Sequence, residues 1–208
     1  MTSVAIIDYG VGNLRSLEKA FAATGTPAVV SDDAHLLRAA RALVLPGVGA
    51  FGACMKALES RGFDRLVIDR VAEGTPLLGV CVGMQMLFEE SEEFGRTAGL
   101  GLLRGKVRRF TGDLPVPHVG WNQVEQTRID PLMSGIEDHS FFYFVHSYFC
   151  VVDEPQVVLG RTDYLTNYAS AVASGNISGV QFHPEKSQAN GLKLLSNFAQ
   201  LSAESQPS

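Results

Sequence analysis

Gly79-Val80-Cys81-Val82-Gly83-Met84-Gln85 is the stretch of sequence that decides how this chain folds. The apolar run at residues 76–80 predicts a buried strand, and the pattern at residues 84–90 predicts a helix. Cys81 has a glycine two residues before it and another two residues after it. This spacing is typical of the strand–nucleophile–helix turn of hydrolases, with sulfur in place of oxygen, where small neighbours let the backbone bend tightly.

Cys81 has two interpretations at this turn. A thiol there points at the N-terminus of the following helix, where backbone N–H groups favour the thiolate, so the residue is a candidate nucleophile. The alternative is an inert core cysteine, because cysteines in apolar runs are commonly buried. Residues about a hundred positions downstream favour the first interpretation.

Length and composition narrow the possible functions. The 208 residues are 46% hydrophobic and 19% charged, which is typical of a globular chain that buries a substantial core. A net charge of −5 argues against nucleic acid as the partner. Cys54, Cys81 and Cys150 are widely spaced, so they predict neither a disulfide framework nor a metal site, and they favour a reducing compartment.

We expect a cytoplasmic protein. The N-terminal segment has no basic stretch ahead of its apolar run, so no signal peptide is predicted. The longest apolar stretches, residues 77–88 and 141–152, are shorter than the roughly 20 residues that span a bilayer, so no membrane contact is expected. Neither a metal ion nor another cofactor is predicted.

Strands and helices alternate in the first half of the chain. Strands are predicted at residues 4–7, 28–30, 42–45 and 76–80, with helices at 14–21, 35–40, 51–58 and 63–71. This order indicates a parallel, doubly wound sheet, in which ligands bind beyond the carboxyl ends of the strands. The loop Pro46-Gly47-Val48-Gly49 and the Cys81 turn both follow such ends, so we expect them to face one another across a cleft.

The second half of the chain is rich in predicted strands. They cover residues 104–110, 119–126, 141–152, 157–161, 169–173 and 177–182, and a helix follows at 192–201. No repeat or linker divides the chain. The predicted fold is therefore one α/β domain over residues 1–208, with a mixed, mostly parallel central sheet, flanking helices and a β-rich second half.

A glycine-rich loop also follows the first strand. Asp8-Tyr9-Gly10-Val11-Gly12 precedes a helix that Asn13 is suited to cap. The position invites a dinucleotide-binding interpretation, but Arg15 stands where the third glycine of that motif belongs. Plain turn chemistry is the simpler interpretation.

His183 and Glu185 follow the last predicted strand. Residues two apart in extended backbone point to the same side, and Pro184 stiffens the step between them. Glu185 can therefore fix the tautomer of His183 and support its charged form while the other ring nitrogen faces a nucleophile. Together with Cys81 they predict an acyl-transfer triad. A surface histidine at a strand end is the alternative for this motif in isolation.

These motifs resemble those of the triad-type class I glutamine amidotransferases. Residues 79–85 are similar to the nucleophile signature of that family, and Gln181-Phe182-His183-Pro184-Glu185 is similar to its histidine–glutamate signature. Four further stretches, residues 8–16, 46–51, 117–122 and 143–148, resemble one branch, the glutaminase subunits of imidazole glycerol phosphate synthases. The likeness runs over essentially the whole chain.

The resemblance implies a flavodoxin-like core, a single type-1 glutamine amidotransferase domain and no cofactor. It implies that Cys81, His183 and Glu185 hydrolyse L-glutamine to glutamate and ammonia. It also implies a heterodimer with a cyclase subunit, a (β/α)₈ barrel that uses the ammonia to form imidazole glycerol phosphate and aminoimidazole carboxamide ribotide in histidine biosynthesis. Because one glutaminase-sized domain accounts for all 208 residues, we expect the cyclase to be a separate chain.

Acyl transfer also needs donors for the developing oxyanion. The N–H group of Val82, next to the nucleophile, is one candidate, and Val48 or Gly49 in the facing loop is the second. Glycines on both sides of Val48 permit a peptide flip, so we expect this donor to turn into place when the partner binds its own substrate.

The resemblance assigns two further groups of residues. The glutamine pocket is expected to comprise Gly47, Gln85, His146, Ser147 and Tyr148. The partner surface is expected to comprise Asn13, His118, Trp121, Asn122 and Lys186. A tryptophan is a frequent interface anchor, but burial of Trp121 in the core is the alternative.

Other functions stay open at this point. The chain is also compatible with a glutaminase that serves another synthase, or with a hydrolase of γ-glutamyl substrates. A catalytically silent binding or regulatory subunit is a further alternative, against which the presence of Cys81, His183 and Glu185 argues.

Overall fold

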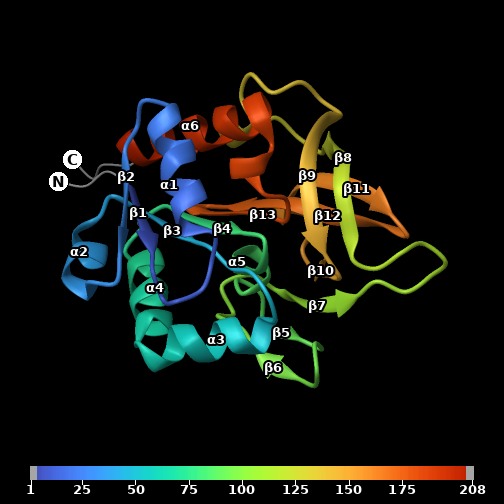
Figure 1. Ribbon diagram of the computed structural model, residues 1–208, viewed down its shortest axis with the longest axis horizontal. Helices are drawn as coiled ribbons and strands as arrows, with labels where there is room; N and C mark the ends of the chain where they lie inside the picture. The colour runs from blue at the N-terminus through green and yellow to red at the C-terminus, as the bar shows by residue number, and fades with distance from the viewer. Residues whose placement is uncertain (1–3, 205–208) are drawn as a thin grey trace.

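A computed structural model describes residues 4–204 and shows a central sheet with helices on both faces (Figure 1). Residues 1–3 and 205–208, the two ends of the predicted domain, lie outside the described residues. The parallel part of the sheet contains five strands. They are β1 (Val4–Ile7), β2 (Ala28–Ser31), β3 (Ala42–Leu45), β4 (Leu77–Val80) and β13 (Ile177–Val180).

Every residue of β1, β3 and β4 is buried. Strands covered on both faces read as continuous apolar runs, which is how the sequence presents them. The predicted parallel, doubly wound core is confirmed.

Helices cover this core on both sides (Figure 1). α1 (Leu14–Ala23) and α6 (Gln188–Glu204) lie together on one face. α3 (Phe51–Ser60) and α4 (Phe63–Ala72) lie on the other, with α2 (Ala34–Ala39) beside α4. Within residues 4–204, no helix combines the length and the apolar character that crossing a membrane requires.

Further strands extend the same sheet in antiparallel pairs, apart from one short parallel pair. β12 (Thr166–Ser174), β10 (Tyr148–Val152), β7 (Gly105–Arg109), β5 (Glu90–Ser91) and β6 (Thr97–Ala98) follow β13 in spatial order. β11 (Val158–Tyr164), β8 (His118–Gln126) and β9 (Ser140–His146) branch from β12. Short 3₁₀ helices are η1 (Pro131–Met133), η2 (Pro155–Val157) and η3 (Pro184–Lys186).

Two predicted elements were wrong in extent. The strand predicted over residues 141–152 is divided at Ser147 into β9 and β10. The helix after Cys81 is a single turn, α5 (Val82–Gln85), and does not continue to residue 90. The carbonyl groups of Met86 and Leu87 instead accept hydrogen bonds from the backbone of residues 100, 102 and 103, so the apolar pattern there belongs to a buried loop.

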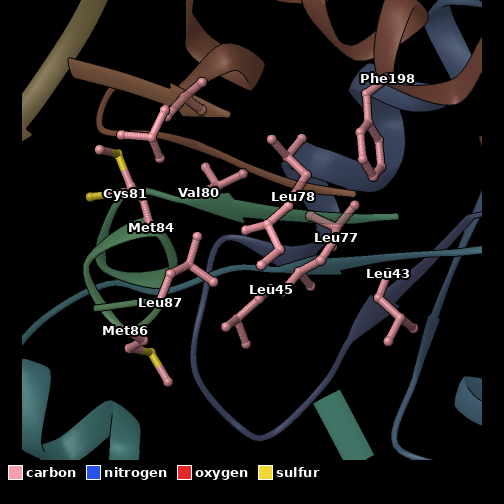
Figure 2. Close-up of a cluster of buried hydrophobic side chains, with 14 of the residues drawn as sticks. Leu43, Leu45, Leu77, Leu78, Val80, Cys81, Met84, Met86, Leu87 and Phe198 are labelled. Atoms are coloured by element: carbon pink, nitrogen blue, oxygen red, sulfur yellow. The ribbon is translucent and has the colours of Figure 1, made fainter. Parts of the chain in front are cut away.

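β4 and β13 pair in parallel, with Val80 opposite Val180. The N–H of Cys81 extends this ladder by donating to the carbonyl oxygen of Val180 at 2.8 Å. Figure 2 shows Leu77, Leu78 and Val80 leading along β4 to Cys81 at its carboxyl end. The residues after β4 and after β13 therefore emerge side by side.

Gly79 and Gly83 let the turn of α5 lie directly against the sheet. A Cβ atom on Gly83 would lie 1.9 Å from the carbonyl oxygen of Leu45, and one on Gly79 would lie 2.7 Å from that of Gly83. Both distances are too short for any side chain. The two glycines around Cys81 are therefore required by backbone contact with β3 and β4.

We predict that Gly83→Ala destabilises the protein by about 1–3 kcal/mol, because the new methyl group must push α5 away from β3. Urea unfolding measures this loss. Gly52→Ala is the matched control: in α3 its Cβ would lie 3.5 Å from the nearest atom, Oγ1 of Thr97, so the free energy of unfolding should not fall. Equal stability of Gly83→Ala and the parent chain would contradict the packing argument.

Candidate active site

A cavity of about 320 Å³ lies where the chain leaves the carboxyl ends of three parallel strands. Val48 and Gly49 follow β3, Cys81 and Val82 follow β4, and His183 follows β13. The expected facing of the two loops across a cleft is confirmed. The remaining lining residues are Gln85, Glu93, Pro117, Val145, His146, Ser147, Tyr148 and Lys186.

Cys81 adopts a strained backbone conformation, with φ 56° and ψ −114°. A non-glycine residue in such a region costs about 1–3 kcal/mol, and the surrounding structure must hold it there. The hydrogen bond to Val180 and the contacts of the flanking glycines provide this support. The strain turns the side chain away from the strand, so that Cys81 lines the cavity.

His183 and Glu185 form a buried pair. Nδ1 of His183 lies 2.9 Å from Oε1 of Glu185, and the two side chains are 6% and 1% exposed. The backbone N–H of His183 donates to the carbonyl oxygen of Tyr143 at 2.9 Å, which ties the segment to β9. The other ring nitrogen, Nε2, is therefore available to form a hydrogen bond with Cys81.

Opposing effects set the pKa of His183. Burial by itself lowers this pKa, but the hydrogen bond with Cys81, the hydrogen bond with Glu185 and the negative charges of both partners raise it to about 10. The imidazole ring therefore stays protonated at neutral pH. A protonated His183 beside Cys81 is the arrangement that activates a cysteine nucleophile.

The loop after β3 is held in place through its carbonyl groups. Three consecutive carbonyl oxygens each accept one hydrogen bond. The pairs are the Tyr9 hydroxyl with Pro46 (2.6 Å), the Val82 N–H with Gly47 (3.3 Å) and the Cys54 thiol with Val48 (3.4 Å). The Val82 N–H, expected to bind an oxyanion, is thus occupied by the Gly47 carbonyl in this conformation.

The glycine-rich loop after β1 supports this neighbouring loop. Tyr9 is buried where its hydroxyl reaches Pro46, and a Cβ on Gly12 would lie 3.0 Å from Cβ of Pro46. Such close packing agrees with turn chemistry and gives no support to a dinucleotide site.

Tyr148 also lines the cavity, and its carbonyl oxygen holds two neighbouring side chains in place. It accepts hydrogen bonds from Nε2 of Gln85 at 3.0 Å and from Nδ1 of His146 at 2.8 Å. Because a carbonyl only accepts, Nδ1 of His146 carries the proton, and Nε2 accepts from the hydroxyl of Tyr168 at 3.1 Å. Burial lowers the pKa of His146 to about 3, so the ring is neutral.

The residues expected to meet a partner fall into different environments. Trp121 is 45% exposed, so the alternative of a core tryptophan is wrong. With Val119 and Phe141, both more than half exposed, it forms an apolar surface on β8 and β9. Nζ of Lys186 lies 5.8 Å from the ring centre of Tyr143 beside this surface. Asn122 is half-buried and donates to the carbonyl of Asp163.

One of these residues differs from expectation. His118 is 4% exposed, stacks on Tyr164 with ring centres 3.9 Å apart, and lies 3.4 Å from His146 through Nδ1. Its side chain therefore does not form part of the surface. Asn13 is half-buried, and its Nδ2 atom donates a hydrogen bond to Oε1 of Glu185 at 3.3 Å.

Sequence reasoning missed two residues of the site. Gln181 is fully buried, with Nε2 3.8 Å from Sγ of Cys81, and the two-residue spacing that paired His183 with Glu185 also applies to it. Glu93 lines the cavity and accepts the N–H of Phe51 at 2.6 Å, but it lies in an irregular loop with no sequence signal. Within residues 4–204, no group of three or more ligand-type side chains is arranged to hold a metal ion.

Sequence comparisons agree over nearly the whole chain. The family model described as glutamine amidotransferase class-I matches residues 5–201. The imidazole glycerol phosphate synthase subunit HisH of Moorella thermoacetica is 48% identical over 97% of this chain and 96% of its own length. The same subunit of Nitrosomonas europaea is 48% identical over 95% of this chain and 98% of its own length.

Solved structures share the fold at lower identity. A crystal structure of a glutamine amidotransferase matches with a TM-score of 0.77 at 23% identity, covering 96% of this chain and 98% of its own. The structure of PurLQS from Thermotoga maritima matches with a TM-score of 0.74 at 20% identity, covering 97% and 99%. These likenesses support the fold alone.

We predict that Cys81→Ala lowers the pKa of His183 below about 10, because it removes the thiol hydrogen bond and charge that raise it. NMR titration of the His183 ring measures the change. In the parent chain, His183 stabilises the folded state fully below its ordinary pKa of 6.5, and this contribution is lost as the pH rises to about 10. In the variant it should be lost at lower pH.

Cys150→Ala is the control for that titration, because it removes a fully buried thiol that does not line the cavity. The pKa of His183 should be unchanged in it. An unaltered titration in Cys81→Ala would contradict the thiol–imidazole interaction.

Proposed function

The chain belongs to the class-I glutamine amidotransferase family, within the branch of imidazole glycerol phosphate synthase HisH subunits, and on this premise we propose how its residues act. It is a glutaminase that hydrolyses L-glutamine to glutamate and ammonia for imidazole glycerol phosphate synthesis, a step of histidine biosynthesis. The observation that carries the proposed site is the buried His183–Glu185 pair beside Cys81.

The thiolate of Cys81 attacks the side-chain amide carbon of glutamine in the first step. The carbon–nitrogen bond breaks, and the imidazolium of His183 gives its proton to the leaving ammonia. In the second step the now neutral His183 takes a proton from water, and the hydroxide formed attacks the thioester. Glutamate leaves and the thiolate returns. Glu185 fixes the tautomer of His183 while the ring is neutral and stabilises its positive charge while it is protonated.

The cavity suits a small amino acid. Its volume of about 320 Å³ is at the lower end of ligand pockets, which run from about 300 Å³. Glu93 supplies a carboxylate that complements an α-ammonium group. Gln85, Ser147 and Tyr148 offer polar contacts for the rest of the substrate, and the Tyr148 carbonyl is held by His146 and in turn holds Gln85.

We propose that the conformation described here is an idle one. The Gly47 carbonyl occupies the Val82 N–H, where acyl transfer requires donors converging on an oxyanion. Rotation of the peptide between Gly47 and Val48 would release the Val82 N–H and turn the Val48 N–H toward the cavity. Gly49, with φ +88°, gives the loop the freedom for this change, and we assign its trigger to the substrate of the partner.

The partner in this proposal is the cyclase subunit, a (β/α)₈ barrel that forms a heterodimer with the chain. The apolar surface of Val119, Trp121 and Phe141 supports a docking role, since exposed apolar groups of this kind mark interaction sites. Lys186 lines the cavity and also lies over Tyr143 beside this surface, so a partner docked here would cover the exit for ammonia. The single continuous sheet supports one domain. The free cysteines Cys54, Cys81 and Cys150 support a location in the reducing cytoplasm.

The function is tested by measuring glutamate release from glutamine by the chain alone, with its cyclase partner, and with partner plus the nucleotide substrate. We predict that the full mixture exceeds the isolated chain by about 10²-fold or more, the effect of one oxyanion donor. Cys81→Ala should lower the rate of the full mixture by about 10⁴-fold or more, while Cys150→Ala keeps it.

The outcomes separate the parts of the proposal. Equal rates of glutamate release with and without the partner would contradict the idle conformation but not the glutaminase activity. Hydrolysis of other γ-glutamyl compounds with no action on glutamine would overturn the glutaminase itself.

Trp121→Ala should weaken association with the cyclase by about 2 kcal/mol, because a half-exposed tryptophan in an apolar surface is a typical interface anchor. Titration calorimetry measures the affinity. Ile129→Ala, which truncates a fully exposed side chain in the loop after β8, is the control and should bind as the parent chain does. Parent-like affinity of Trp121→Ala would exclude this surface as the docking site.

A further inference from the structure

Gln181 contacts the nucleophilic sulfur from inside the protein. Cys81 and Gln181 directly follow the paired residues Val80 and Val180, so they are neighbours across the β4–β13 pair. Nε2 of Gln181 lies 3.8 Å from Sγ of Cys81, while the backbone N–H of Gln181 donates to the carbonyl of Ser170 at 2.9 Å. Because Gln181 is fully buried, it leaves the cavity side of the sulfur open to a substrate.

The orientation of the Gln181 amide is determined by its neighbours. The Tyr148 carbonyl only accepts, so the group of Gln85 that faces it at 3.0 Å must be the NH₂ group. The second hydrogen of that NH₂ group points to Gln181 at 3.0 Å, so the facing atom of Gln181 must be Oε1. The NH₂ group of Gln181 is thereby turned toward the sulfur.

The rest of the turn offers a thiolate at Cys81 little stabilisation, so a hydrogen-bond donor at Gln181 would add to it. The carbonyl oxygen of Val145 lies 3.9 Å from the sulfur, and this acceptor suits a thiol but opposes a thiolate. α5 has one turn only, so its dipole is a weak source of stabilisation.

The ionisable groups that face Cys81 come from several elements. His183 is the cation beside it. Burial raises the pKa of Tyr9, of Cys54 on α3 and of Cys150 on β10, so all three stay neutral near pH 7 and none places a charge beside the sulfur. A neutral donor therefore supplements the imidazolium.

We propose that Gln181 donates a hydrogen bond to the thiolate of Cys81 and thereby stabilises the nucleophile before substrate binds. In the proposed glutaminase cycle, on which this second role rests, it also acts when the thioester is hydrolysed. The carbon–sulfur bond then breaks, its electron pair moves to sulfur, and the amide of Gln181 is already in place to stabilise the departing anion. Gln85 is the positioning residue that aims this donor.

The test is the rate at which iodoacetamide alkylates Cys81 near pH 7, measured on the isolated full-length chain by mass spectrometry. Gln181→Met keeps the length of the side chain and removes the donor, so alkylation should slow by about tenfold, the effect of losing one hydrogen bond to a charged group. Ser170→Ala is the matched control, because it removes a buried hydroxyl from the neighbouring strand and leaves the amide–sulfur contact. It should react as the parent chain does.

A parent-like alkylation rate in folded Gln181→Met would overturn the proposal. If that variant does not fold, NMR spectra of the parent chain and of Cys81→Ala are compared. The side-chain N–H signals of Gln181 should shift upfield in Cys81→Ala, and unchanged signals would overturn the proposal. The alkylation assay needs neither glutamine nor the partner. If alkylation is slower in Gln181→Met but the parent chain never hydrolyses glutamine, only the proposed function is contradicted.

Discussion

The parallel pairing of β4 with β13 is the interaction on which the rest of this structure depends. The register that sets Val80 opposite Val180 brings two segments about a hundred residues apart to one edge of the sheet. Cys81 emerges from one strand and His183 from the other, and the ladder continues through the N–H of Cys81. A slip of one residue would turn the side chains of one strand to the opposite face and separate sulfur from imidazole.

That rigid edge also makes the strain at Cys81 tolerable. The φ of 56° persists because α5 is pressed against β3 and β4, with no room for a side chain at Gly79 or Gly83. Close packing of this kind has few alternative arrangements, so it holds a reactive group in one orientation. The same backbone contacts that exclude larger residues therefore direct the thiol into the cavity.

Two features of the site act in opposite directions: the charge on His183 favours catalysis, and the conformation of the loop after β3 opposes it. Burial opposes the charge on His183, and the charge persists because Glu185 and Cys81 lie on either side of the ring. The nucleophile is thus prepared, while the loop after β3 presents the Gly47 carbonyl to the Val82 N–H. This combination is the basis of the idle conformation that we propose, in which the partner releases the Val82 N–H for catalysis.

Local patterns in the sequence were enough to predict the parallel core, the turn at Cys81 and the shared direction of His183 and Glu185. Each of these depends on residues within a few positions of one another. The length of α5, the division at Ser147, the burial of His118 and the contacts of Gln181 and Glu93 were decided only by the tertiary structure. They depend on partners far along the chain: the backbone after Gln85 bonds to residues 100–103, and the ring of His118 packs on Tyr164. Periodicity reports which face of a segment is buried, but it carries no information on which distant group covers that face.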